Sequence, residues 1–307
     1  MATDVDKTAH NARVCVIGPG RVGFALARRH QLAGHKVTLC GRSGGDWQQI
    51  AQAAGMQSHV GSDPVGIFDR YLFCVADDQL QQAVDQFQSQ LASSLKSTQT
   101  PILFAHTSGL HDFRVFQNGL SASHSQLCMA ALHPIIVFPA PESMTPIADG
   151  FVVSASFQGD SKLAKIAVQT WGGNWLEVES NTERGLYHLA LSQCANHLTG
   201  LLARAEINLT PALGVQAKKV VHQLASTALQ AYAERGAQQA LTGPMVRGDL
   251  ATLQAHLLNV PSEQRALHLQ ELNHLWQLAQ DSGRLLAPAA QKIRDWLDLQ
   301  LSSPSSE

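Results

Sequence analysis

Charged residues are scarce in this chain of 307 residues, and no apolar run approaches the length of a membrane span. Asp, Glu, Lys and Arg make up 15% of the sequence, and the net charge at pH 7 is -2 with histidine neutral. Proteins that bind nucleic acids or anionic membranes carry a basic excess, and a membrane-spanning helix needs about 20 apolar residues. We therefore expect neither a nucleic acid nor a membrane as a partner.

Cysteine is also rare, with five residues, and no two of them have the spacing of a metal-binding pair. Most of them stand in apolar runs, which is typical of buried, reduced cysteines, so we predict a reducing compartment and no metal site. The first dozen residues lack the apolar segment of a secretion signal. We expect a cytoplasmic protein in which residues 1–12 form a disordered tail.

A glycine-rich turn follows a short β-branched run over residues 14–17. Gly18, Gly20 and Gly23 have the G-x-G-x-x-G spacing of dinucleotide-binding folds, and a second strand is expected over residues 36–40. Gly18 permits the tight turn, Gly20 lets a pyrophosphate approach the backbone, and Gly23 lets the helix pack closely on the strand. The pyrophosphate is expected at the helix N-terminus, which favours an anion. The cofactor-binding residues predicted in this turn are Gly18, Pro19, Gly20, Arg21, Val22 and Gly23.

The end of the second strand indicates which dinucleotide binds. NAD-binding folds usually have Asp or Glu here, to bind the ribose 2′-hydroxyl, but this chain has Gly41, Arg42 and Ser43. A guanidinium beside a hydroxyl suits a 2′-phosphate, because charge-assisted bidentate hydrogen bonds are strong. We predict NADP(H) as the cofactor and Arg42 as the main ligand of its 2′-phosphate. The alternative is that Arg42 is a solvated loop arginine.

Polar residues follow three further apolar strands, which we predict over residues 71–76, 102–105 and 128–132. The carboxyl ends of parallel strands lie at one edge of a sheet, where such folds bind ligands. The last two strands each end in a histidine; an ordinary turn is the alternative there, and a helix cap is the alternative for Asp77. The cofactor-binding residues predicted here are Val75, Ala76, Asp77, His106, Thr107 and Ser108, and Ser108 and His133 are predicted at the nicotinamide and the substrate.

Strands and helices alternate from residue 13 to residue 178. This alternation predicts an α/β fold with a doubly wound, parallel sheet of the Rossmann type over residues 13–179. From residue 180 onward the apolar residues recur with a helical period. We therefore predict a second, all-α domain over residues 180–307.

A helix without any Lys, Arg, Asp or Glu is predicted over residues 185–203, and such a helix is expected to be buried on nearly all sides. Ser192 and Asn196 belong to a polar stripe on this helix, with His188 and Thr199, and buried polar groups need hydrogen-bond partners. Facing the nicotinamide, Ser192 and Asn196 would bind the substrate, and Asn196 would donate to its carbonyl or imine. A satisfied polar network between helices is the alternative.

A turn rich in Gly and Pro is predicted over residues 240–249, and it carries Thr242, Arg247 and Asp249. We predict that Thr242 and Arg247 contribute to substrate binding, with Arg247 holding a substrate carboxylate. A helix cap with a local pair between Arg247 and Asp249 is the alternative.

Together these motifs resemble a two-domain family that joins a Rossmann-like half to the domain of unknown function 2520. The family is similar in plan to pyrroline-5-carboxylate, deazaflavin-dependent NADP and ketopantoate reductases. The resemblance implies a helical domain like the C-terminal domain of 6-phosphogluconate dehydrogenase, which often mediates dimers, and hydride transfer at a C=N or C=O bond. Asn196 falls where ketopantoate reductases have a lysine. The residues that carry the resemblance are Gly18–Gly23, His106–Gly109, His133, Pro134, Phe138, Asn196, Ala240–Pro244 and Arg247–Asp249.

These predictions combine into an NADP(H)-dependent oxidoreductase that acts on a small polar, anionic substrate in a cleft between the domains. Ser108, His133 and Asn196 are the predicted catalytic residues, with His133 as the proton donor. We expect a homodimer formed through the helical domain. The alternative is a non-catalytic NADP-binding sensor or interaction protein, because nucleotide-binding folds serve both uses.

Overall fold

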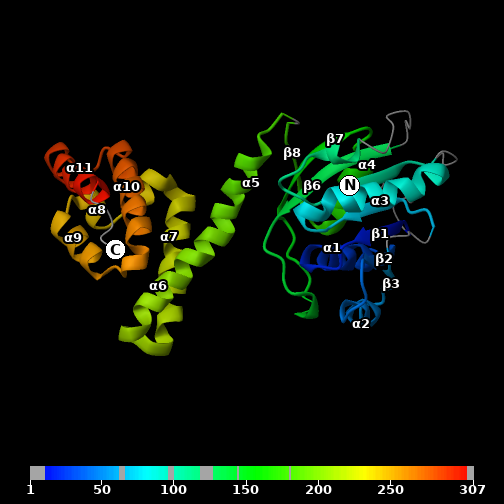
Figure 1. Ribbon diagram of the computed structural model, residues 1–307, viewed down its shortest axis with the longest axis horizontal. Helices are drawn as coiled ribbons and strands as arrows, with labels where there is room; N and C mark the ends of the chain where they lie inside the picture. Colours follow the sequence, from blue (N-terminus) through cyan, green and yellow to red (C-terminus); the bar gives the residue numbers. More distant parts are fainter. Residues whose placement is uncertain are drawn as a thin grey trace, which may run out of the picture. The chain divides into compact units, whose positions relative to one another are not determined.

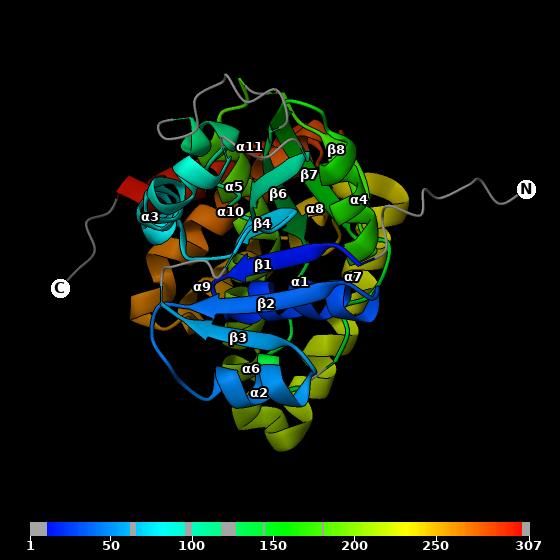
Figure 2. The same cartoon turned by 90° about the vertical axis from the view of Figure 1, so that its right-hand side faces the viewer.

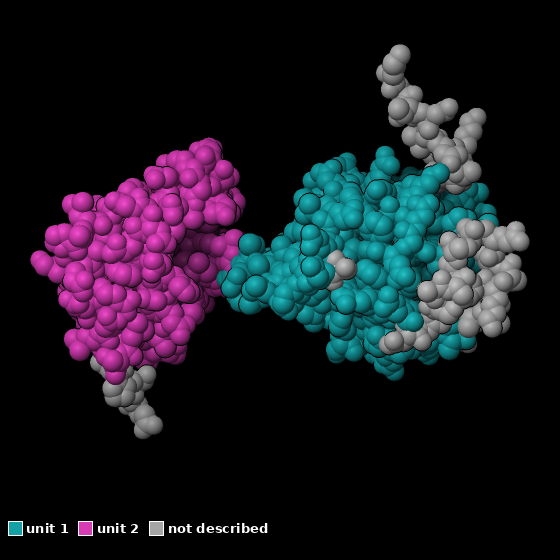
Figure 3. Space-filling model, turned by 90° about the horizontal axis from the view of Figure 1, so that it is seen from above, with its two compact units in different colours: residues 1–197 teal, residues 198–307 magenta. Residues whose placement is uncertain are grey.

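The computed structural model describes residues 11–61, 66–95, 100–117, 127–143, 145–179 and 181–302. The chain divides into two compact units, Met1–His197 and Leu198–Glu307, which Figure 3 colours separately. Most of the tail predicted over residues 1–12 lies outside the described residues. The first unit includes residues 181–197, which the sequence pattern assigned to the helical domain, because the start of that segment docks on the sheet.

In the described part of the chain, an eight-stranded sheet forms the centre of the first unit (Figure 1, Figure 2). Its strands are β1 (Arg13–Ile17), β2 (Lys36–Gly41), β3 (Gln57–Val60), β4 (Arg70–Phe73), β5 (Ile102–His106), β6 (Leu127–Ile135), β7 (Val152–Gln158) and β8 (Asn174–Glu177). The order is β3-β2-β1-β4-β5-β6-β7-β8, parallel from β3 to β6, with β7 antiparallel to β6. The first six strands have the order of the Rossmann fold, which confirms the predicted α/β class.

Helices cover both faces of this sheet. They are α1 (Arg21–Leu32), α2 (Trp47–Ala53), α3 (Asp77–Leu95) and α4 (Lys162–Trp171), with the short 3₁₀ helices η2 (Phe113–Phe116) and η3 (Pro141–Ser143); α5 (Arg184–Ser192) follows β8. Val14 and Val16 of β1 pack in one core with residues of α1, α2 and α4, whereas Cys15 and Ile17 pack in the other with residues of α3 and η2. Because both faces of β1 are buried, its sequence is a continuous apolar run.

Strand β6 continues past the end predicted at residue 132. His133 and Pro134 are predicted to form a polar turn, but they lie inside β6 and pair with Ser154 and Val153 of β7. The antiparallel partner β7 extends beyond the end of the pairing with β5, so the chain stays extended there. His133 therefore lies on a strand and not in a loop.

The charge-free helix predicted over residues 185–203 consists of α5, the π-helical turn Gln193–His197 and the first residues of the next helix. No residue of α5 or of the π-helical turn is buried, so the expected burial on nearly all sides is wrong. Hydrogen bonds from Arg184 and Tyr187 to β7 dock the first turn of α5 on the sheet. These contacts leave the later turns uncovered by the first unit.

The second unit is helical (Figure 1). Its described helices are α6 (Leu198–Leu213), α7 (Ala217–Ala240), α8 (Pro244–Arg247), α9 (Leu250–Asn259), α10 (Arg265–Asp281) and α11 (Ala287–Ser302), and residues of α8 to α11 form its core. Thr210 and Pro211 lie inside α6, where the Thr210 hydroxyl donates to the Glu206 carbonyl at 2.7 Å. None of the described helices is long and apolar enough to cross a membrane.

Candidate functional site

The glycine turn between β1 and α1 has the geometry that the motif predicts. Gly18 has a φ of +102°, and a Cβ added to it would lie 2.5 Å from the Cys74 carbonyl oxygen. A Cβ on Gly23 would clash with the Gly18 carbonyl oxygen, whereas a Cβ on Gly20 would meet no atom within 4 Å. Gly18 and Gly23 therefore serve the turn itself, and Gly20 borders open space at the start of α1.

The N-terminus of α1 is free to accept an anion. Gly20 is the N-cap residue, no side chain caps the helix, and its first turn contains no acidic residue. Exposed amides together with the helix dipole suit a pyrophosphate at this position. Arg21 donates to the Phe138 carbonyl at 3.4 Å, and Val22 packs against the core.

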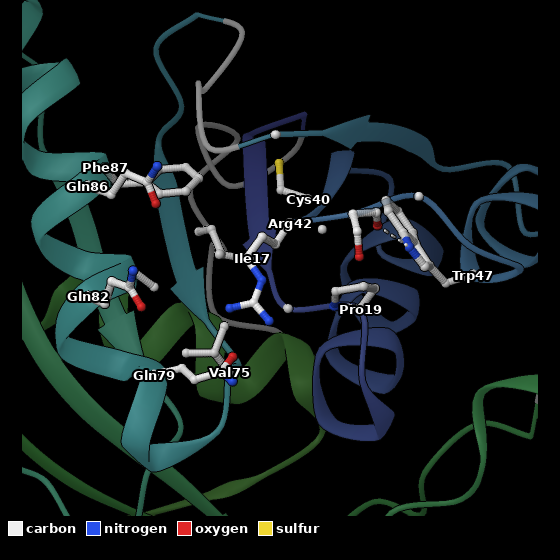
Figure 4. Close-up of a pocket in the computed structure, with 16 residues that line it drawn as sticks. Ile17, Pro19, Cys40, Arg42, Trp47, Val75, Gln79, Gln82, Gln86 and Phe87 are labelled. Carbon is white, nitrogen blue, oxygen red and sulfur yellow. Dashed lines mark hydrogen bonds between the residues drawn. The ribbon is translucent and has the colours of Figure 1, made fainter.

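A cavity of about 320 Å³ opens beside the glycine turn (Figure 4). It lies between the ends of β1 and β2 and the first half of α3. Of the predicted cofactor-binding residues, six line it, namely Gly18, Pro19, Gly41, Arg42, Ser43 and Val75. The other lining residues are Ile17, Cys40, Gly44, Trp47, Gly61, Gln79, Gln82, Ala83, Gln86 and Phe87.

Among the described residues that line this cavity, Arg42 is the one with a charged side chain. Its guanidinium points into the cavity, toward Val75 and Gln79 (Figure 4). The side chain forms no hydrogen bond or ion pair with any described residue, so its donors are available to a ligand. Arg42 is exposed, so this arrangement agrees both with the predicted phosphate ligand and with the alternative of a solvated loop arginine.

Three glutamines and a tryptophan belong to this site, and the sequence analysis did not select them. Gln79, Gln82 and Gln86 lie on α3 with spacings of three and four, so they share the face that lines the cavity. Trp47 packs against Gly41, where an added Cβ would lie 2.6 Å from its ring, and its Nε1 donates to the Ser43 carbonyl at 3.1 Å. The spacing of the glutamines on the helix after β4 was the feature of the sequence that could have indicated a polar face at this site.

Asp77 and Asp78 occupy the first turn of α3, where carboxylates interact favourably with the helix dipole. This placement agrees with the alternative role near a helix N-terminus. Neither Asp77 nor Ala76 lines the cavity.

The residues after β5 are engaged in hydrogen bonds within their own turn. His106 is fully buried; its Nδ1 accepts from the Ser108 amide at 3.2 Å, and its Nε2 lies 2.9 Å from the Asp112 carbonyl oxygen. Burial lowers the pKa of His106 to about 4. The Ser108 hydroxyl accepts from the amides of Leu110 and His111, both at 3.1 Å. These bonds give His106 and Ser108 a role in shaping the turn.

Thr107 forms its hydrogen bonds with the neighbouring strand β4. Its amide donates to the Phe73 carbonyl at 3.1 Å, and its hydroxyl lies 3.5 Å from the same oxygen. Thr107 therefore ties the end of β5 to the end of β4.

A polar cluster connects the end of β6 with α5. The Tyr187 hydroxyl lies 2.6 Å from Ser154 Oγ and 3.2 Å from His133 Nδ1, and His188 is stacked edge-on against His133 at 6.0 Å between ring centroids. Burial is the main cause that lowers the pKa of His133 to about 4, and the neighbouring His188 adds to it. His133 is therefore neutral at pH 7. The sequence pattern selected His133 but gave no reason to select Tyr187.

Gly109 makes room for this cluster. A Cβ at Gly109 would lie 2.7 Å from His188 Cδ2 and 2.9 Å from His133 Cε1. The close approach of both imidazoles to the turn after β5 thus requires glycine at this position.

Asn196 lies in the π-helical turn Gln193–His197, is exposed, and donates from Nδ2 to Ser192 Oγ at 3.2 Å. Single π-helical turns are frequent at functional sites. The polar stripe predicted to contain Ser192 and Asn196 is thus present as a hydrogen-bonded pair.

Thr242 and Arg247 lie in the second unit, near the start and the end of α8. Arg247 Nη2 lies 3.9 Å from Asp249 Oδ2, and Asp249 caps α9 by accepting from the Thr252 amide at 3.1 Å. These contacts agree with the alternative of a helix cap with a local ion pair.

One protein-family model matches much of the second half of the chain and part of the first unit. Residues 150–289 match the model of Domain of unknown function (DUF2520). This match confirms the resemblance that the motifs carry. A comparison with curated proteins gives no match.

Solved structures with the same fold span nearly the whole chain. The Bacteroides fragilis protein BF3122, provisionally named an NADP oxidoreductase, has a TM-score of 0.65 and 16% identity, and the match covers 89% of this chain and 98% of that one. Plasmodium falciparum pyrroline carboxylate reductase with NADP bound has a TM-score of 0.56 and 13% identity, and the match covers 89% of this chain and 98% of that one. An imine reductase from Pseudomonas sp. has a TM-score of 0.53 and 17% identity, and the match covers 94% of this chain and all of that one. At these identities the likeness establishes the shared fold.

Proposed function

We propose that this protein is an NADP(H)-dependent oxidoreductase that transfers a hydride to or from a C=O or C=N bond of a small, polar, anionic substrate. The observation that carries the proposal is the cavity at the end of β2, where Arg42 points inward and no carboxylate stands among the described residues of the wall. A carboxylate there would repel a 2′-phosphate, whereas a free guanidinium attracts it. The NADP named in a structure of the same fold supports this choice of cofactor.

The fit of the cofactor rests on three features of the first unit. Gly20 borders open space, the first turn of α1 has no acidic residue or side-chain cap, and Arg42 has free donors. We assign the pyrophosphate to the α1 N-terminus and the 2′-phosphate to Arg42 and Ser43. When bound, NADPH supplies the hydride for reduction.

We assign substrate binding and polarisation to residues at the end of β6, in the turn after β5 and in the π-helical turn after α5. We assign Asn196, through its exposed amide, to donate a hydrogen bond to the acceptor atom that gains charge. The low pKa of His133 disfavours the imidazolium that a proton donor needs, so we assign His133 to hold the Tyr187 hydroxyl in place. Ser108 shapes the turn next to them.

The proposal is tested first by cofactor binding and then by turnover. Calorimetry is expected to show NADPH binding to the purified chain, with weaker binding of NADH. NADPH absorbance is then followed with a panel of keto acids, imines and cyclic imino acids, and one of them is expected to consume NADPH. Tight NADPH binding without turnover across the panel would favour the alternative of a sensor, and no binding of either nucleotide would contradict the proposal.

A further inference from the structure

Arg184, the first residue of α5, lies over a polar strip of β7. Its Nη2 donates to Ser156 Oγ at 2.7 Å, and its guanidinium carbon lies 5.5 Å from the centre of the Tyr187 ring. Ser154, two residues earlier on the same face of β7, binds the Tyr187 hydroxyl. One turn of α5 thus places a guanidinium and a phenol side by side on the sheet.

No carboxylate neutralises this guanidinium in the part of the chain that the structure describes. Arg184 takes part in no ion pair there, and its Nε is buried without a hydrogen-bond partner. Asp112 lies near enough for Arg184 to lower its pKa, but Arg114 engages its carboxylate through a hydrogen bond from Nε at 2.7 Å. A buried, unpaired guanidinium donor is costly, because it loses hydration without gaining a partner.

The other groups around Arg184 carry no charge at neutral pH. Arg184 acts electrostatically on His106 and His133, and burial lowers the pKa of both histidines to about 4. The remaining neighbours are the hydroxyls of Ser154, Ser156 and Tyr187. Apart from the paired Asp112 and Arg114, the groups around Arg184 are thus neutral and polar.

We propose that Arg184 binds the carboxylate of the substrate, with Ser156 fixing the orientation of its guanidinium. This inference rests on the proposed function and deepens it, because it names the residue that selects an anionic substrate. Ser156 engages Nη2 and Nε is buried, whereas Nη1 donates to no described residue; a guanidinium held in this way offers a carboxylate charge-assisted hydrogen bonds. Arg184 is better suited to this role than Arg247, which already lies beside Asp249.

The site also lies where the substrate is expected. His133, Ser154 and Tyr187 meet at the end of β6, whose carboxyl edge is shared with the glycine turn of β1. In open parallel sheets this edge is the ligand-binding edge. A carboxylate on Arg184 would therefore anchor one end of the substrate beside the Tyr187 hydroxyl.

The test compares acids with their amides by calorimetry, with the full chain saturated with NADPH and also without it. The probes are pyruvate and 1-pyrroline-2-carboxylate, each beside its primary amide. We expect at least one acid to bind more tightly than its amide, and Arg184→Met to weaken that acid about 10- to 100-fold while the amide changes little. Arg184→Lys keeps the charge but loses the planar fork, so a smaller loss is expected.

Lys165→Met on α4 is the matched control, because it removes a cation from the opposite face of the sheet and should leave acid binding unchanged. Circular dichroism establishes that each variant folds, and where Arg184→Met fails to fold, the loss in Arg184→Lys decides. Equal binding of acids and amides to the native chain overturns the proposal. Acid binding by Arg184→Met that is as tight as that of the native chain also overturns it, and so does a loss of acid binding in Arg247→Met but not in Arg184→Met. NADPH binding, measured separately, shows whether the proposed function itself fails.

Discussion

The Tyr187 hydroxyl of α5 lies 3.2 Å from Nδ1 of His133 on β6. This contact joins a residue after the last strand to a residue inside the sheet, and Ser154, which pairs with His133 across β6 and β7, lies 2.6 Å from the same hydroxyl. The three groups form one hydrogen-bonded cluster at the ligand-binding edge of the sheet. The start of α5 is consequently part of the first unit in structure and, as we propose, in function.

Arg42 is expected to determine the preference for NADPH over NADH. Arg42→Ala removes the only charged side chain among the described residues that line the cavity, so NADPH affinity should fall about 10- to 100-fold while NADH affinity changes little. Calorimetry with both nucleotides measures the change. Arg13→Ala, an exposed arginine outside this cavity, serves as the control. An equal loss for both nucleotides would argue against a 2′-phosphate at Arg42.

Gly18 and Gly20 should respond differently to the same substitution. Gly18→Ala places a Cβ 2.5 Å from the Cys74 carbonyl oxygen at a φ of +102°, so the free energy of unfolding should fall by about 1 to 3 kcal/mol or more. Gly20→Ala meets no atom within 4 Å, so stability should be retained while NADPH binding weakens. Urea unfolding and calorimetry separate the two effects. Normal NADPH binding by Gly20→Ala would contradict the assigned pyrophosphate position.

His106 and His133 should make the protein less stable in mild acid. Burial lowers the pKa of each to about 4, whereas the unfolded chain has a histidine pKa near 6.5, so the unfolded state binds more protons between these values. The contribution of these neutral histidines to the free energy of unfolding is complete above pH 6.5, and it is lost as the pH falls toward 4. At pH 5 the loss relative to pH 7.5 should be about 2 kcal/mol per histidine, measured by urea unfolding. His133→Gln should remove about half of this pH dependence; an unchanged pH dependence would show that His133 is not neutralised by burial.

Asn196 is expected to affect turnover without affecting the cofactor. Asn196→Ala removes an exposed amide donor, so kcat should fall about 100-fold while the Kd for NADPH stays within about twofold. Steady-state kinetics and calorimetry provide the two numbers. Asn259→Ala, which removes an amide on α9, is the control. Parallel losses in kcat and NADPH affinity would contradict a role at the acceptor atom.

Local patterns predicted much of the fold because they reflect constraints that act within a few residues. The run over residues 14–17 is apolar because helices cover both faces of β1. The turn needs glycine at Gly18 because of its positive φ, and at Gly23 because the turn's own carbonyl is close. The predicted role of Arg42 as a phosphate ligand was likewise based on its position at the end of β2.

Longer-range features were predicted poorly, for a different reason in each case. His133 was placed in a turn because its sequence does not show that β7 pairs with it and extends β6. The helix over residues 185–203 was expected to be buried because it lacks charge, although only its first turn is docked by hydrogen bonds to β7. The lack of charge along a helix indicates that some face avoids water, but it does not say which partner covers it.

The sequence by itself determined the alternation of strands and helices in the first unit, the glycine turn and the cation at the end of β2, because backbone conformation and apolar periodicity are local properties. Only the tertiary structure brought Gln79, Gln82 and Gln86 to the wall of the Arg42 cavity and set Tyr187 and Arg184 on the serines of β7. These contacts join residues far apart in the chain or on separate elements. Their geometry depends on how the helices and strands pack, which no short stretch of sequence encodes.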